Sequence, residues 1–210
     1  LKIGSSHLGA GSRLECGSML DASPVVMDSC LEQRRRPVAV VTGGNKGIGF
    51  EIARGCVEAG FTVVITARDA SRGQEAACAL GCNWAMLDLD DHDSVSACAI
   101  DIGQKYGQID VLINNASMAY KHADPTPWVQ KTHTTVHTNF FGTLAVFQAF
   151  SDLIKDGGKI VTVASGSGHL TVVPDARLRQ EFAAAETSLT VQRLAELLAQ
   201  FVSDVEESTS

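Results

Sequence analysis

This sequence of 210 residues lacks the features that favour a nucleic-acid-binding or membrane-spanning protein. Its 17 Lys and Arg residues are outnumbered by 24 Asp and Glu residues, so the net charge is −7 and no basic stripe could neutralise phosphates. The densest basic cluster, Arg34-Arg35-Arg36, is short, and we interpret it as a solvated flank. No apolar run approaches the roughly 20 residues that cross a bilayer. We therefore expect neither nucleic acid nor a membrane as a partner.

Cysteine and histidine are present, but not in the arrangements that hold a metal. Cys78 and Cys82 are spaced i, i+4 without a second Cys or His pair, so we predict no zinc site. His133 and His137 have the spacing of a metalloprotease helix but lack the glutamate that should follow the first histidine. No signal-peptide pattern precedes the six cysteines, which favours a reducing, cytoplasmic location.

The most informative segment runs from Val38 to Phe50, where an apolar run leads into a glycine-rich turn and then into apolar residues at helical spacing. Gly43 and Gly47 can adopt backbone conformations that a side chain forbids, and Gly49 allows the helix to lie close to the sheet. The N–H groups and dipole at a helix start attract a pyrophosphate. The segment therefore predicts a nucleotide-binding turn between a strand and a helix.

Strand and helix patterns alternate from Pro37 onwards. The strand runs are apolar throughout, which is typical of parallel strands covered on both faces. Such alternation predicts a Rossmann-type, doubly wound α/β fold with strand order 3-2-1-4-5 and a ligand at the carboxyl ends of the strands. The predicted strands are 38–42, 61–66, 83–88, 110–114 and 159–164, and the predicted helices are 47–59, 71–80, 92–106 and about 127–155.

Further motifs agree with the glycine turn. Asn114-Asn115-Ala116 follows an apolar run, Asn139-Phe-Phe-Gly142 lies in a later helix, and Ser165 ends the fifth predicted strand. Together these motifs resemble the short-chain dehydrogenase/reductase family, and within it the NADPH-dependent carbonyl reductases. The resemblance implies reduction of aldehydes, ketones or quinones to alcohols, with a small-molecule carbonyl substrate and a monomeric complete protein. It extends from about Pro37 to the C-terminus, and its most similar stretches are Gly43–Gly49, Thr66–Asp69, Asp124–Pro127 and Thr138–Thr143.

The cofactor preference follows from the end of the second strand. NAD-preferring enzymes place an acidic residue there, whereas this chain has Ala67 followed by Arg68. Together with Lys46 in the glycine turn, this favours the 2′-phosphate of NADP(H) over two merely solvated charges. The resemblance assigns Asp88 and Leu89 to the adenine and Asn115 to its ribose, although a loop carboxylate and a structural asparagine are the alternatives. The predicted cofactor-binding residues are Gly43, Asn45, Lys46, Gly47, Ile48, Gly49, Arg68, Asp88, Leu89, Asn115 and Ala116.

The resemblance implies two catalytic residues. Ser165 would hydrogen-bond the substrate carbonyl, and Asn139 would hold a water on the proton path. The family's Tyr-x-x-x-Lys motif should follow Ser165 and is absent from this sequence. The only tyrosines, Tyr106 and Tyr120, precede Ser165, and each has an aspartate four residues on.

The remaining segments lead to two expectations about the chain. Residues 1–36 show no periodicity and are expected to be a disordered or non-native leader, with a transit peptide as the alternative. The apolar spacing from Leu194 to Val205 predicts a helical insertion at about 175–205, after which the incomplete NADP-binding domain of residues 37–210 stops. The fifth strand would then be an exposed, aggregation-prone edge.

Three functional hypotheses follow. The first is a fragment of a carbonyl reductase, and the second is a catalytically inactive protein that binds NADP(H) or a partner. The third, a methyltransferase on a similar sheet, is weakened by Ser165, by Asn139 and by the lack of an acidic residue at the end of the second strand.

Overall fold

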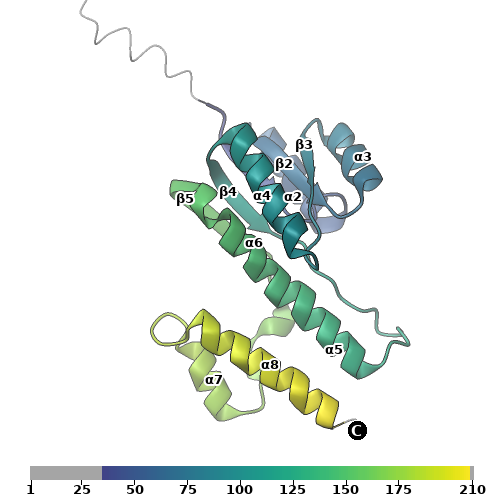
Figure 1. Cartoon of the computed structure of the whole chain (residues 1–210), viewed down its shortest axis with the longest axis vertical. Helices are drawn as coiled ribbons and strands as arrows, with labels where there is room; N and C mark the ends of the chain where they lie inside the picture. The colour runs from purple at the N-terminus through teal and green to yellow at the C-terminus, as the bar shows by residue number, and fades with distance from the viewer. Residues whose placement is uncertain (1–34, 209–210) are drawn as a thin grey trace, which may run out of the picture. The chain divides into compact units, whose positions relative to one another are not determined.

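A computed structural model describes residues 35–208 of the chain (Figure 1). The predicted leader at residues 1–36 lies outside the described residues except for Arg35 and Arg36. In the described part a single parallel sheet has five strands in the order β3-β2-β1-β4-β5, which confirms the predicted order. The strands are β1 (Val38–Val41), β2 (Thr62–Ala67), β3 (Asn83–Met86), β4 (Ile109–Asn114) and β5 (Ile154–Thr162).

Helices connect successive strands, as in the predicted α/β alternation. Two aspartates determine where helices begin: the Asp69 side chain accepts a hydrogen bond from the N–H of Arg72, and Asp91 caps the next helix in the same way. The helices are α2 (Gly47–Glu58), α3 (Ala70–Leu80), α4 (His92–Tyr106), α5 (Trp128–Val136), α6 (Thr143–Phe150), α7 (Ala176–Ala183) and α8 (Val191–Glu207).

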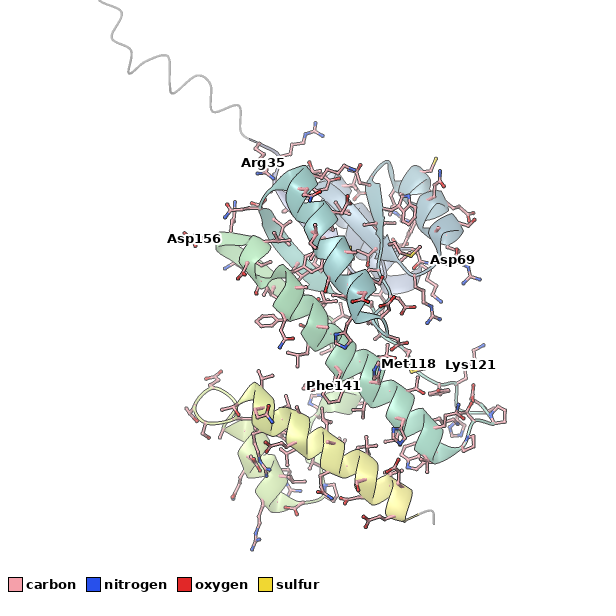
Figure 2. The ribbon with its side chains drawn as sticks, in the orientation of Figure 1. Arg35, Asp69, Met118, Lys121, Phe141 and Asp156 are labelled. Atoms are coloured by element: carbon pink, nitrogen blue, oxygen red, sulfur yellow. The ribbon has the colours of Figure 1, made fainter. Side chains whose placement is uncertain are left out.

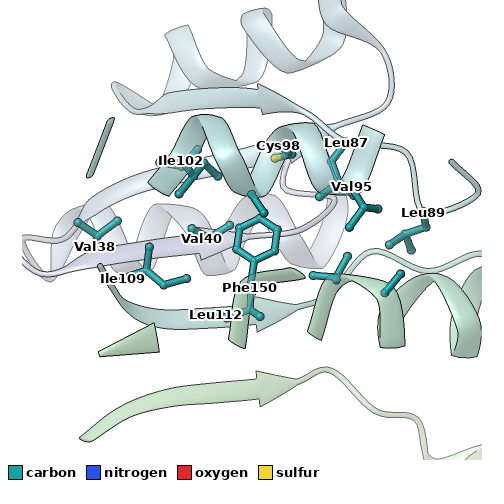
Figure 3. Packing of buried hydrophobic residues seen from close by; sticks show 14 residues of the cluster. Val38, Val40, Leu87, Leu89, Val95, Cys98, Ile102, Ile109, Leu112 and Phe150 are labelled. Carbon is teal, nitrogen blue, oxygen red and sulfur yellow. The ribbon is translucent and has the colours of Figure 1, made fainter. Parts of the chain in front are cut away.

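Alternating side chains of β1 point into two separate cores on the two faces of the sheet. Val38 and Val40 pack with α4 and α6, whereas Ala39 and Val41 pack with α2 and α3. Figure 3 shows the first cluster, in which the fully buried ring of Phe150 points from α6 toward the sheet. These two cores hold the carboxyl ends of the strands in place, where the glycine turn lies.

The single long helix predicted at about 127–155 is wrong in two respects. A π-helical segment, η1 (His137–Gly142), separates α5 from α6, and a short 3₁₀ turn, η2 (Ser151–Leu153), ends the helical run. The last two residues of the predicted helix belong to β5, which starts at Ile154 rather than at Lys159. β5 begins early because its pairing with β4 shifts register between Ile109 and Val111.

β5 forms one edge of the sheet in the described part of the chain. The side chains of Ile160 and Val161 are 40% and 47% exposed, although their sequence is as apolar as that of the buried strands. The expected exposed edge is therefore confirmed for these residues.

The described residues after β5 form no further strand, and they contain two α-helices in the region predicted as helical, about 175–205. Two short 3₁₀ turns, η3 (Gly166–Gly168) and η4 (Leu170–Val172), lead to α7 and α8. α8 packs against α5, and His133 Nε2 lies 2.6 Å from Glu206 Oε1 between them. In residues 35–208 no helix is both long enough and apolar enough to span a membrane.

Candidate functional site

A cavity of about 390 Å³ opens at the carboxyl ends of β1, β2, β3 and β4. All eleven residues predicted to bind the cofactor line this cavity. They come from four segments that are far apart in the sequence, so the fold brings them together as the strand order requires. The lining residues that were not among the predicted cofactor-binding residues are Ala67, Leu87, Ser117, Met118 and Thr138.

The glycine turn has the backbone shape that the sequence predicts. Gly43 has φ +65° and Gly47 has φ +58°, in the left-handed region that side chains rarely adopt. A Cβ on Gly43 would also lie 2.9 Å from the Cα of Ala116. Lys46 caps α2 without a side-chain hydrogen bond, and the first turn of the helix contains no acidic residue. The helix start therefore presents its N–H groups to the cavity without competition from a side chain.

Asn115 and Thr42 tie the loop after β4 to the glycine turn. The Asn115 side-chain amide donates to the carbonyl oxygens of Thr42 (2.9 Å) and Gly43 (3.3 Å). The Thr42 hydroxyl oxygen accepts from the backbone N–H of Asn115 (3.0 Å) and of Ala116 (2.9 Å). Asn115 thus lines the cavity and also stabilises the glycine turn, which is the structural alternative named for it from the sequence.

The close approach at Gly49 is more specific than predicted. A Cβ there would lie 2.3 Å from Asn115 Nδ2 and 2.6 Å from the Gly43 carbonyl oxygen. The helix therefore contacts the Asn115 side chain and the turn, not the sheet in general.

Two cations lie at the cavity without partners in the described part of the chain. Lys46 and Arg68 are both exposed, and neither side chain makes a hydrogen bond or ion pair with another residue between 35 and 208. The carboxylate nearest in sequence, Asp69, accepts a hydrogen bond from the N–H of Arg72 (2.9 Å). The cations can therefore hold an anionic group at the cavity.

Asp88 is held within the turn that follows β3. Its backbone N–H donates to Ser94 Oγ (3.0 Å), and its carboxylate accepts from the N–H of Asp90 (3.1 Å). Asp88 and Leu89 thus reach the cavity from a turn that is braced by α4.

Asn139 and Ser165, the predicted catalytic residues, do not line the cavity. Asn139 lies in the π segment, where its side chain accepts from the N–H of Met118 (2.8 Å) and donates to the Met118 carbonyl (2.9 Å). Figure 2 shows Met118 beside the helix that carries this segment. Ser165 is exposed, and its hydroxyl oxygen accepts from the N–H of Ser167 (3.2 Å). Their catalytic roles remain predictions.

Of the lining residues outside the predicted set, four lie within two positions of a predicted cofactor-binding residue, and Thr138 directly precedes Asn139, a predicted catalytic residue. Ala67 precedes Arg68 and Leu87 precedes Asp88, so the strand ends could have indicated them. Thr138 lies at the start of a stretch that carries the family resemblance, but no periodicity distinguishes it.

Comparison with known proteins identifies the class. The family model described as short chain dehydrogenase matches residues 37–175, and the chain belongs to this family. Among curated relatives, carbonyl reductase [NADPH] 1 of Rattus norvegicus is 39% identical over 180 residues, and that of Homo sapiens is 41% identical over 177 residues. These alignments cover 82% and 81% of this chain but only 64% and 63% of the relatives.

Two plant enzymes are similar in structure. Salutaridine reductase from Papaver somniferum matches with a TM-score of 0.74 and 26% identity, over 82% of this chain and 72% of that protein. Menthone neomenthol reductase from Mentha piperita matches with a TM-score of 0.75 and 28% identity, over 82% of this chain and 75% of that protein.

Proposed function

We propose that these 210 residues bind NADP(H) and belong to a reductase that converts carbonyl compounds to alcohols. The observation that carries the proposal is a pair of cations, Lys46 and Arg68, whose side chains have no partner among residues 35–208. They lie at a cavity whose β2 end holds Ala67 in place of a carboxylate. A carboxylate there would bond ribose hydroxyls and repel a 2′-phosphate, whereas a guanidinium can hold a phosphate through two hydrogen bonds. The relatives named carbonyl reductase [NADPH] agree with this choice.

The residues present fit a dinucleotide. A Cβ on Gly47 would meet nothing within 4 Å, so the turn is open at this glycine, and the start of α2 is open to a pyrophosphate. We assign Lys46 and Arg68 to the 2′-phosphate, Asp88 and Leu89 to the adenine wall, and the remaining predicted lining residues to the ribose and pyrophosphate. The cofactor supplies the hydride when it is bound. The chain's own residues bind and orient it.

Carbonyl reduction is proposed of the whole protein. Ser165 would donate a hydrogen bond to the substrate carbonyl, and Asn139 would hold a water on the proton path. The reaction also needs a proton donor, and the 210 residues contain no Tyr-x-x-x-Lys after Ser165. That observation favours the second candidate for this polypeptide taken alone, which is NADP(H) binding without turnover.

Binding and turnover separate the two candidates. Titration with NADPH and NADH by calorimetry should show tighter binding of NADPH, and Arg68→Ala should remove most of the difference. Arg72→Ala, which removes an exposed arginine outside the cavity lining, is the matched control. Equal affinity of the wild type for both cofactors would contradict the assignment.

Turnover is measured as NADPH oxidation with a quinone or an aromatic aldehyde. We expect binding with no measurable turnover in the 210-residue polypeptide, because a general acid is typically worth about 10²–10⁴ in rate. Turnover at the rate of an ordinary reductase that Ser165→Ala abolishes would overturn that expectation.

We also propose that the whole protein is monomeric, lies in the cytoplasm and has a small carbonyl compound as substrate. Cys56, Cys78, Cys82 and Cys98 of the described chain are all free thiols, as expected in a reducing compartment. Cell fractionation and size-exclusion chromatography of the whole protein test the two points.

A further inference from the structure

Asp90 is an exposed residue in the turn that follows β3. Its neighbours Asp88 and Leu89 line the cavity, but Asp90 does not. One carboxylate oxygen of Asp90 accepts a hydrogen bond from the Thr138 hydroxyl at 2.6 Å, and the same oxygen lies 3.2 Å from Nδ1 of His137. Thr138 lines the cavity and is only 6% exposed. A single carboxylate thus connects two walls that lie 48 residues apart in the sequence.

A second contact joins the same two segments. A Cβ on Gly142, at the end of the π segment, would lie 2.6 Å from the carbonyl oxygen of Leu89 and 2.8 Å from its Cβ. The β3 turn and the π segment therefore touch without a side chain between them. At this contact the backbones fix how closely the segments approach, and the Asp90–Thr138 hydrogen bond fixes how they are oriented.

We propose that Asp90 is a positioning residue for nucleotide binding, acting through its hydrogen bond to Thr138. It holds the wall formed by Asp88 and Leu89 against the wall formed by Thr138, so that the cavity has its binding shape before the nucleotide arrives. An ionised acceptor suits this role because hydrogen bonds to charged groups are the stronger ones. The inference rests on the proposed binding of NADP(H), since it names the residue that orients that same cavity.

The test uses the full 210-residue chain and NADPH as the probe. Asp90→Ala removes the acceptor, and Thr138→Val removes the hydroxyl while keeping the shape of the side chain. Thr138→Ser restores the hydroxyl. Asp101→Ala is the matched control, because Asp101 is an exposed aspartate of α4 outside this cavity. Kd is measured by calorimetry, and the melting temperature of each variant is recorded without ligand.

We expect Asp90→Ala and Thr138→Val each to raise the Kd for NADPH about tenfold, the scale of one hydrogen bond to a charged group. Thr138→Ser and Asp101→Ala should bind within about twofold of the wild type. The double variant Asp90→Ala/Thr138→Val should bind no more weakly than either single variant, because both remove the same interaction. A merely structural role would lower the melting temperatures of Asp90→Ala and Thr138→Val but leave the Kd for NADPH of the folded variants unchanged.

The outcomes separate the two proposals. If the wild type binds NADPH and Thr138→Val binds equally well, the positioning role is wrong and the proposed function stands. Additive losses in the double variant would also overturn the role of the pair. If the wild type does not bind NADPH, the proposed function and this inference both fail. If Asp90→Ala does not fold, the comparison of Kd between Thr138→Val and Thr138→Ser still tests the positioning role.

Discussion

β1 and the apolar end of β5 at Ile160 and Val161 belong to the same sheet, but their surroundings are opposite. Every residue of β1 is at most 2% exposed, whereas Ile160 and Val161 of β5 are 40% and 47% exposed. The apolar run in each strand reflects the preference for a pleated, covered position. Whether a strand is actually covered depends on which elements pack on it, and these differ between the centre and the edge of the sheet.

The largest expected effect is a buried charge in β1. Val40→Asp places a carboxylate where the side chain is 0% exposed, and it should lower the free energy of unfolding by more than about 4 kcal/mol. Val161→Asp makes the same change at a side chain that is 47% exposed, and it should cost less than about 1 kcal/mol. Urea denaturation measures both, and equal losses would contradict the contrast between the strands.

A cavity in the core should have the next largest effect. Phe150→Ala removes a fully buried ring and should cost about 3–5 kcal/mol. Phe147→Ala, on the same helix at 43% exposure, should cost about 1 kcal/mol or less. Thermal melting of the two variants provides the comparison. If Phe147→Ala were the more damaging change, the assignment of the core would be wrong.

Two of the three glycines of α2, Gly49 and Gly55, allow a comparison between the cavity side and the outer face of one helix. Gly49→Ala forces a Cβ to within 2.3 Å of Asn115 Nδ2 and should cost about 1–3 kcal/mol, with weaker nucleotide binding. Gly55→Ala meets nothing within 4 Å and should stabilise the helix by about 0.5–1 kcal/mol. Opposite signs in urea denaturation are expected, and a stabilising Gly49→Ala would show that the turn tolerates a side chain.

The exposed edge should affect association more than folding. Val161→Lys places a charge on an edge strand, which is how natural sheets discourage pairing with another chain. Light scattering of the 210-residue polypeptide at increasing temperature should show later aggregation for Val161→Lys than for the wild type. Arg36→Lys, which changes no charge, is the control. Unchanged aggregation would mean that another surface drives association.

The smallest effect concerns two thiols in different surroundings. Burial, together with the nearby Asp101 charge, raises the pKa of the Cys98 thiol from its ordinary value of 9.0 to about 12, whereas Cys78 is exposed. A thiol reagent at pH 8 should therefore modify Cys78 and leave Cys98 unmodified until the protein unfolds, as peptide mapping would show. In the unfolded chain the Cys98 thiol ionises at a lower pH than in the folded protein. We therefore expect Cys98 to lower the free energy of unfolding as pH rises above about 9. Rapid modification of Cys98 in the folded protein would contradict its burial.

The strands and the glycine turn were predictable from local patterns in the sequence, and the strand order followed from the α/β alternation. Other lining residues, such as Asp88, Leu89 and Asn115, were predicted only through the family resemblance. Apolar runs mark strands, and glycines mark the turn at their ends. The interruption of the predicted helix at 127–155 was not predictable in this way, because His137–Gly142 reads as ordinary helix and its π geometry depends on contacts with Leu89 and Met118. The early start of β5 depends likewise on its register with β4.

The exposed position of Ser165 shows how far the site could be predicted from sequence motifs. A motif can name a residue type at a given spacing, but the direction of that side chain depends on the elements packed around it. Thr138 illustrates the converse, since its place in the wall follows from the Asp90 carboxylate, which no motif includes.

The π segment rotates the faces of α6 relative to those of α5 around the common helix axis. An additional residue in one turn rotates everything that follows by about 100° around the axis, because an α-helix has 3.6 residues per turn. α5 can therefore direct its contacts toward α8 while α6 directs its own toward α4 and the sheet. The helical run thus packs in two directions, and Thr138, at the change between them, lines the cavity.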